Sequence, residues 1–143
     1  MIQPSTELME LMTRWYARSS AGDSGVIEEI LSHDPALLTI GTDPAEWLMG
    51  FDAIAPLYQA QIGAVGDVKI APGQLLAFSA GDVGWVADCP RITLPDGTSF
   101  TMRSTLVFHR EKGAWKLIQQ HNSVGVSNEE LVGSLLPLAA AAG

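Results

Sequence analysis

Hydrophobic positions follow helical spacing in the first third of the chain. One helix is predicted after the start signal Ser5, from residues three and four positions apart: Leu8, Leu11, Met12 and Trp15. A shorter helix is expected over 26–31. A third is expected to begin at Asp52, with Pro56 in its first turn, where a missing N–H is tolerated. Two short strands, 36–40 and 46–49, are expected between the second and third helices.

From Gly66 onward the pattern changes to that of long strands. They are expected over 68–80 with a break at 71–73, and over 83–94, 98–110 and 114–126, with a hairpin turn at Pro95-Asp96-Gly97. Ser127 and Glu130 form a capping box that predicts a short final helix. Helices followed by an antiparallel sheet indicate an α+β fold. We therefore expect one domain over 1–126 and a short C-terminal helix and tail over 127–143.

The last two predicted strands carry polar residues at their far ends. Alternation places Arg103 and Thr105 on one face of the first strand, and it places His121 and Ser123 on the same face as Trp115 in the second. Pairing across the turn at 111–113 would bring those four polar residues together. A face that is apolar near the turn and polar away from it could line a pocket.

Composition narrows the classes of function. The chain has 143 residues, of which 47% are hydrophobic and 17% charged, which indicates a folded domain with a core. Its net charge of −8, without a basic cluster, disfavours binding to nucleic acids or anionic membranes. Cys89 is the only cysteine, so no internal disulfide can form. Neither a signal peptide nor a membrane span is evident, and a cytoplasmic location is expected.

Several motifs together resemble the nuclear transport factor 2-like superfamily, and within it the SnoaL-like domains, which are related to ketosteroid isomerase and limonene epoxide hydrolase. The resemblance rests on the order of these segments: Ala21-Gly22-Asp23, Asp34-Pro35, Gly50-Phe51-Asp52, Arg103-x-Thr105, Gly113-x-Trp115 and His121-x-Ser123. It implies a curved antiparallel sheet wrapped around helices as a cone, with a pocket at the open end. It also implies a homodimer formed through the outer face of the sheet.

The catalytic residues of the related enzymes do not carry over. The steroid isomerases would need a carboxylate within 36–40, and there is none. Trp15 stands where a tyrosine is expected, with Tyr16 beside it, and Thr105 stands where an aspartate is expected. The epoxide hydrolases pair an arginine with an aspartate, and here Arg103 remains without its carboxylate. No catalytic set of the family is intact.

His121 and Arg103 are the candidate catalytic residues. His121 could act as a general base or be a core histidine bonded to Thr105 or Ser123. Arg103 could hold a carboxylate or carbonyl of a ligand, or pair with Asp88. Candidate substrate-binding residues are Thr105, Ser123, Trp15, Tyr58, Trp85, Asp88 and Trp47. Asp88 and Trp85 lie on opposite faces of one strand, and Trp85 is favoured as the one facing inward.

Two functions remain open. The first is a small-molecule pocket for an apolar ligand or one bearing a carboxylate or carbonyl. As an enzyme, such a protein would be an acid–base isomerase, cyclase, dehydratase or hydrolase that needs no cofactor. The second is a non-catalytic module for ligand binding or dimerisation. Three separated histidines without other ligands nearby predict no metal site, and no nucleotide-binding motif is present.

Overall fold

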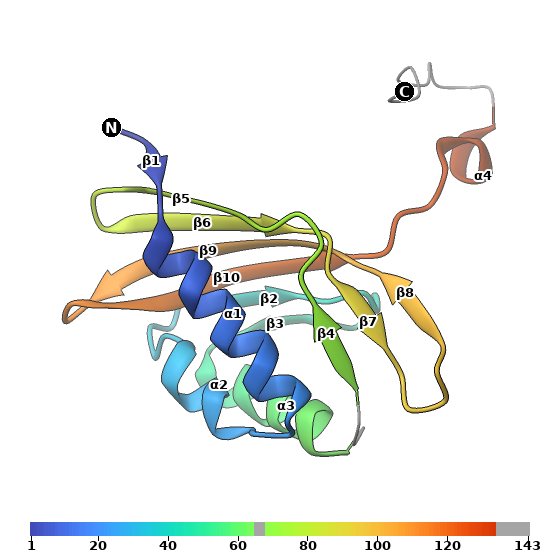
Figure 1. Ribbon diagram of the computed structural model, residues 1–143, viewed down its shortest axis with the longest axis horizontal. Coiled ribbons are helices and arrows are strands. Elements are labelled where there is room, and N and C mark those ends of the chain that lie inside the picture. The colour runs from blue at the N-terminus through green and yellow to red at the C-terminus, as the bar shows by residue number, and fades with distance from the viewer. Residues whose placement is uncertain (65–67, 134–143) are drawn as a thin grey trace.

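The chain folds into a large curved sheet with three helices packed against one of its faces (Figure 1). This computed structural model describes residues 1–64 and 68–133. The three helices, and a fourth that lies apart from the sheet near the C-terminus, are α1 (Thr6–Ser20), α2 (Gly25–Ile30), α3 (Phe51–Ala64) and α4 (Asn128–Val132). No helix in the described ranges is long and apolar enough to cross a membrane.

The strands form two sheets. The larger has the order β1 (Gln3–Pro4), β5 (Leu76–Ala80), β6 (Val83–Asp88), β9 (Arg103–Glu111), β10 (Ala114–Ser123), β2 (Leu38–Ile40) and β3 (Trp47–Met49). The smaller has the order β4 (Lys69–Ala71), β7 (Arg91–Thr93) and β8 (Ser99–Thr101). Neighbouring strands are antiparallel except β10 and β2, which are parallel. The predicted α+β class is confirmed.

Two of the long strands predicted from sequence are broken in the structure. The segment 83–94 divides at Cys89 and Pro90 into β6 and β7, and 98–110 divides at Met102 into β8 and β9. Pro90 has no N–H for a sheet ladder, while its carbonyl accepts the Met102 N–H at 3.0 Å. The hairpin of β7 and β8 therefore leaves the main sheet and pairs with β4 beside α1 (Figure 1).

Two helices begin at the cap residues predicted from the sequence, whereas α3 begins one residue earlier than predicted. Ser5 caps α1 by accepting the Leu8 N–H at 3.3 Å, and Ser127 caps α4 by accepting the Glu130 N–H at 3.1 Å. α3 begins at Phe51, so Pro56 lies in its second turn and not in its first. The predicted tail over 134–143 lies outside the described residues.

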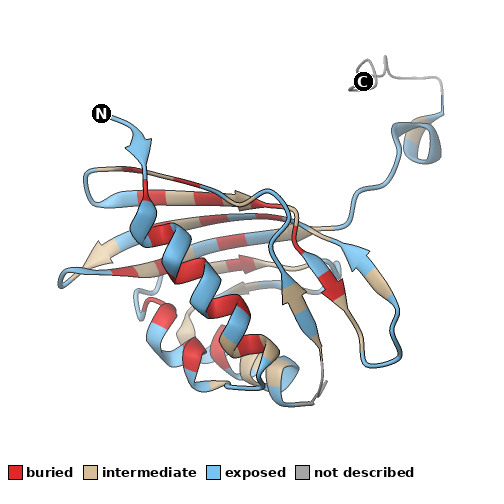
Figure 2. Ribbon diagram, viewed as in Figure 1, coloured by how far each residue is buried: buried red, intermediate tan, exposed pale blue. Residues whose placement is uncertain are grey.

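The core fills the space between the main sheet and the helices, where the buried positions of both face each other (Figure 2). Phe108 and Leu117 from the sheet and Leu8 from α1 are fully buried. Each such side chain contributes roughly 1.5–3 kcal/mol through burial. α1 packs so closely over β6 that a Cβ at Gly84 would lie 2.5 Å from the Leu8 side chain.

A β-bulge in β10 decides which side chains point toward the helices. Leu117 pairs with Phe108 and Gln119 pairs with Val107, which leaves Ile118 without a partner. One extra residue moves every later side chain to the opposite face of the sheet. The prediction that Trp115 and His121 share a face is therefore wrong.

Candidate functional site

A cavity of about 410 Å³ lies between the helices and the two sheets. Its wall is mainly apolar and includes Met12, Trp15, Ile27, Ile62, Ile70 and Ile92. Among the described residues that line it, none has a charged or imidazole side chain. Pockets of this size and polarity are typical of small-molecule sites.

A chain of hydrogen bonds forms much of the polar part of the cavity wall, to which Tyr16, Ser19 and Gln61 also belong. The Tyr58 hydroxyl lies 3.0 Å from Thr39 Oγ1 and donates to Gln120 Oε1 at 2.6 Å. Gln120 Nε2 donates to Asn122 Oδ1 at 3.3 Å, and Ser104 Oγ donates to the same oxygen at 2.6 Å. α3 therefore joins β2, β10 and β9 through uncharged groups, and all but Thr39 line the cavity.

Tyr58 is a neutral phenol in this chain of bonds. Burial raises its pKa to about 12, an effect that the nearby Glu46 adds to and the hydrogen bond with Thr39 opposes. The hydroxyl thus keeps its proton throughout the physiological range. It can supply a hydrogen bond, but it is not a base.

Asp88 is held at the end of β6 by four hydrogen bonds. Its Oδ1 accepts the backbone N–H groups of Gly73, Gln74 and Cys89 at 3.0, 2.8 and 2.8 Å. Its Oδ2 accepts the Tyr16 hydroxyl at 2.8 Å. Burial, and then the bond to Asp88, raise the pKa of Tyr16. With both oxygens occupied, Asp88 fixes the loop before β5 against β6 and α1.

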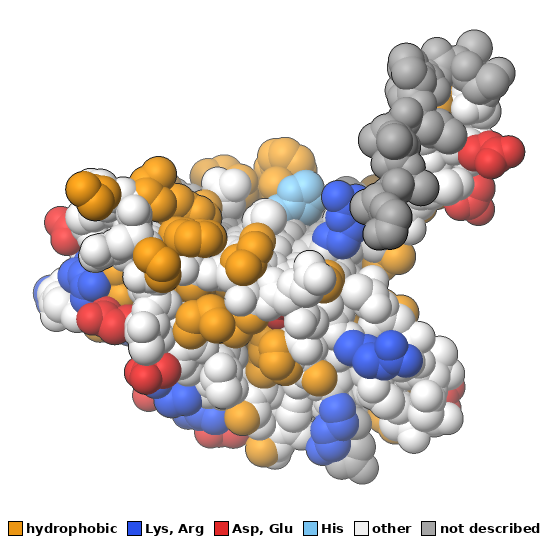
Figure 3. All heavy atoms as spheres, turned by 45° about the horizontal axis from the view of Figure 1, so that its top comes forward, with side chains coloured by type: hydrophobic (Ala, Val, Ile, Leu, Met, Phe, Trp, Pro, Cys, Tyr) orange, Lys and Arg blue, Asp and Glu red, His pale blue; other side chains and the backbone are white. Residues whose placement is uncertain are grey.

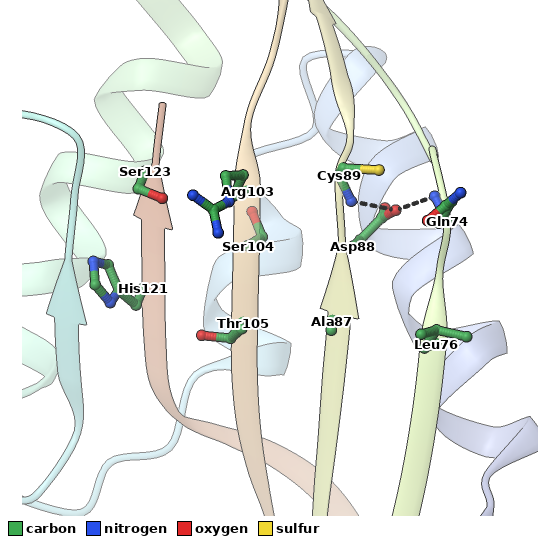
Figure 4. A pocket seen from close by; sticks show the side chains of 10 residues that line it. All are labelled: Gln74, Leu76, Ala87, Asp88, Cys89, Arg103, Ser104, Thr105, His121 and Ser123. Carbon is green, nitrogen blue, oxygen red and sulfur yellow. Dashed lines mark hydrogen bonds between the residues drawn. The ribbon is translucent and has the colours of Figure 1, made fainter. Parts of the chain in front are cut away.

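The four polar residues singled out from the sequence do lie together. Thr105 pairs directly with His121, and Arg103 pairs with Ser123. Figure 4 shows the Arg103 side chain reaching from β9 toward Ser123 and His121 on β10. They line an open depression of about 460 Å³ with Leu76 and Ala87.

That depression lies on the outer face of the sheet, not in the cavity. Arg103, Thr105 and His121 are exposed, whereas their neighbours Ser104 and Gln120 are buried and face the helices. The expectation that they line the interior pocket is wrong. On β9 the alternate positions Ser104, Leu106 and Phe108 are the buried ones, and on β10 the bulge at Ile118 turns His121 and Ser123 outward. His121 is not a core histidine, and Arg103 forms no ion pair with Asp88 or with any other residue in 1–64 and 68–133.

The aromatic candidates divide between the cavity and the surface. Trp15 and Tyr58 line the cavity, as expected for pocket walls. Trp47 is 65% exposed and does not. The preference for Trp85 as the inward residue of β6 is also wrong, since Asp88 is buried and Trp85, at opposite parity, lies near Phe78 on the outer face.

The outer face carries two rows of residues across six strands. The register places in one row Leu76, Ala87, Thr105, His121, Ile40 and Trp47. It places in the next row Phe78, Trp85, Val107, Gln119, Leu38 and Met49. Figure 3 shows hydrophobic side chains gathered on this side of the molecule. Neither row contains a carboxylate.

Sequence reasoning missed Ser104, Gln120 and Asn122 as cavity residues. Alternation without a bulge places His121 on the same face as the core residue Trp115, and therefore inside. It places Gln120 and Asn122 on the other face, and therefore outside. One signal was available, since Ser104, Gln120 and Asn122 are themselves three polar residues at one end of the hairpin. In the described chain no group of three histidine, cysteine or carboxylate side chains could hold a metal ion.

Comparisons with known proteins agree on the family and the fold. A sequence model of the SnoaL-like domain matches residues 8–127. No protein of curated function matches the sequence. An NTF2-like protein of unknown function from Pseudomonas putida is 23% identical, with a TM-score of 0.78 over 90% of this chain and 94% of its own.

Two further solved structures are similar. One is a provisionally assigned dehydratase of the NTF2-like family from Streptomyces avermitilis, at 18% identity and a TM-score of 0.73, covering 85% of this chain and 95% of its own. The other is a provisionally assigned ketosteroid isomerase from Parabacteroides distasonis, at 14% identity and a TM-score of 0.68, covering 82% and 85%. At these identities the likeness concerns the fold.

Proposed function

Because the chain belongs to the SnoaL-like domain family, we propose that it binds a small, uncharged and largely apolar molecule in the cavity between the helices and the sheets. The observation that carries the proposal is the wall itself. It combines apolar side chains with one hydrogen-bonded chain of neutral groups, Tyr58, Gln120, Asn122 and Ser104. Burying a charged ligand there without a partner would be strongly unfavourable.

The geometry favours binding over acid–base catalysis by His121. His121 lies on the opposite side of the sheet from the cavity, so its imidazole cannot reach a ligand held there. Asp88 is the only buried carboxylate among the described residues, and its oxygens accept hydrogen bonds from four donors. A proton acceptor must lie within hydrogen-bond reach of the proton that it removes.

The test is calorimetric titration with tetralin, a neutral bicyclic hydrocarbon. Wild-type protein should bind it, and Met102→Trp, which fills the cavity, should weaken binding at least tenfold. His121→Ala is the matched control on the outer face and should bind as the wild type does. Loss of binding in His121→Ala with retention in Met102→Trp would move the site to the outer face and refute the proposal.

The outer face of the sheet supports a second element of the proposal, a homodimer. Trp47, Met49 and Leu76 are 65%, 59% and 54% exposed on the two outer rows. The chain as a whole has a charge of −8, but these rows have no carboxylate, so two copies could meet there without opposed negative charges.

Sedimentation velocity tests the dimer. Wild-type protein should sediment as a dimer, and Val107→Glu, in the centre of the second row, should sediment as a monomer. Ala60→Glu is the control, because it adds the same single negative charge at an exposed position of α3, away from the outer face of the sheet. A monomeric wild type would refute this element and leave the cavity proposal standing.

A further inference from the structure

We infer that the Asn122 side-chain amide is the hydrogen-bond donor for the ligand, and that the ligand carries a neutral acceptor oxygen, such as a ketone, on an apolar body. This inference rests on the proposed function, since it concerns the same cavity. Its evidence is the direction of the hydrogen bonds in the cavity wall and the Asn122 N–H groups that take part in none of them.

Two short distances fix the orientation of both amides. The contacts from Tyr58 to Gln120 and from Ser104 to Asn122 are both 2.6 Å. Hydrogen bonds between two oxygens have this length, whereas those from nitrogen to oxygen are about 2.7–3.2 Å. The amide oxygens therefore face the hydroxyls, and each amide nitrogen points the other way.

The remaining bonds follow from this orientation. Tyr58 has one hydroxyl proton and gives it to Gln120, so Thr39 must be the donor in its contact with Tyr58. Gln120 Nε2 then donates to Asn122 Oδ1, which also accepts from Ser104. Every bond in the chain runs toward Asn122.

Asn122 ends the chain with its donors unused. Its Oδ1 already accepts two hydrogen bonds, while its Nδ2 bonds to no residue within 1–64 and 68–133. Asn122 lines the cavity, so these N–H groups are available to a ligand. Because upstream donors polarise the amide, it should donate more strongly than an isolated one.

The donor selects among classes of ligand. A ketone, ester or amide oxygen can accept from Nδ2 and needs no counter-charge. A carboxylate would lack a cationic partner among the described lining residues, and its desolvation would be uncompensated. A hydrocarbon would leave the amide unsatisfied.

Ser19 provides an independent indication that the cavity accepts polar atoms. Its Oγ is buried, lies in the same wall and has no hydrogen-bond partner in the described chain. Such a group is expected to find a partner. Ser19 is outside the chain that ends at Asn122, so it is the competing donor position, and Ser123 on the outer face is the control.

The experiment compares two ligands that differ in one oxygen. Dissociation constants for 1-tetralone and tetralin are measured by calorimetry with wild type, Asn122→Leu, Asn122→Asp, Ser19→Ala and the outer-face control Ser123→Ala. The readout is the dissociation constant of tetralin divided by that of 1-tetralone, taken within each protein. Any effect of a substitution on the binding of both ligands alike cancels in this ratio. Asn122→Asp keeps the acceptor for Ser104 and Gln120 if Asn122→Leu fails to fold.

The ratio should be about tenfold lower in Asn122→Leu than in wild type, and lower still in Asn122→Asp, whose carboxylate repels the ketone oxygen. Ser123→Ala should keep the wild-type ratio, and so should Ser19→Ala if Asn122 is the donor. An unchanged ratio in the Asn122 variants overturns the inference, and a drop confined to Ser19→Ala overturns it by assigning the donor to Ser19. If neither ligand binds the wild type, the proposed function is overturned together with the inference. If both bind but the Asn122 variants keep the ratio, only the inference fails.

Discussion

Replacing Asp88 with alanine should destabilise the fold more than any other single change at the end of β6. Asp88 accepts the Tyr16 hydroxyl and three backbone N–H groups, and thereby ties the loop at Gly73 and Gln74 to the sheet. Alanine removes the acceptor from all four donors at once. No other described side chain accepts a hydrogen bond from them.

The magnitude follows from how well water can replace the carboxylate. Gly73 and Gln74 are exposed, so their N–H groups can be hydrated at modest cost. Tyr16 is only 8% exposed, and its hydroxyl would remain without a partner. A buried donor left unsatisfied costs about 1–3 kcal/mol, and loss of the bonds to a charged acceptor adds to this, which gives roughly 3 kcal/mol in total.

Urea unfolding followed by tryptophan fluorescence measures this change. Asp88→Asn is the matched variant, because it keeps one oxygen for the three N–H groups, and should cost about 1 kcal/mol. Tyr16→Phe should destabilise the wild type but have little further effect in Asp88→Ala, with a coupling of about 1 kcal/mol. The reasoning is refuted if Asp88→Ala and Asp88→Asn are equally stable, or if Tyr16→Phe costs the same in both backgrounds.

Two further predictions concern Tyr58 and the glycines. Burial raises the pKa of Tyr58 to about 12 in the fold, so its proton is lost near pH 10 only when the chain unfolds. The stability that this contributes is complete below pH 10 and declines as the pH rises toward 12. By urea titration, the stability advantage of wild type over Tyr58→Phe should therefore shrink by about 1 kcal/mol between pH 8 and pH 11, and a constant advantage would contradict the shift. Gly84→Ala should destabilise by about 1–3 kcal/mol because its Cβ would meet Leu8, whereas Gly63→Ala, with open space around it in α3, should stabilise by up to about 1 kcal/mol. Equal effects at both positions, measured by thermal unfolding, would show that the close packing of α1 on β6 is unimportant.

The outline of the fold is predictable because it depends on local signals. Helical spacing from Leu8 to Trp15, the Ser5 cap and the turn at Pro95-Asp96-Gly97 are each set by neighbouring residues. The order of helices and strands then indicates an α+β fold, and the motifs of the resemblance indicate the family. The approach of Thr105 to His121 also follows from the turn at 111–113, although their exact pairing depends on the bulge at Ile118.

The face on which that pair lies depends on tertiary structure. Alternation is a local rule, but a bulge is a property of two strands, and the extra residue Ile118 moves His121 out of the interior and Gln120 and Asn122 into it. Hydrogen bonds between residues far apart in sequence, such as Tyr58 with Gln120, then orient the amides of the cavity. The sequence by itself determined the elements, the family and the polar end of the last hairpin. Only the packed structure decided which polar residues of that hairpin face the cavity and which way they donate, because both depend on contacts that no local pattern contains.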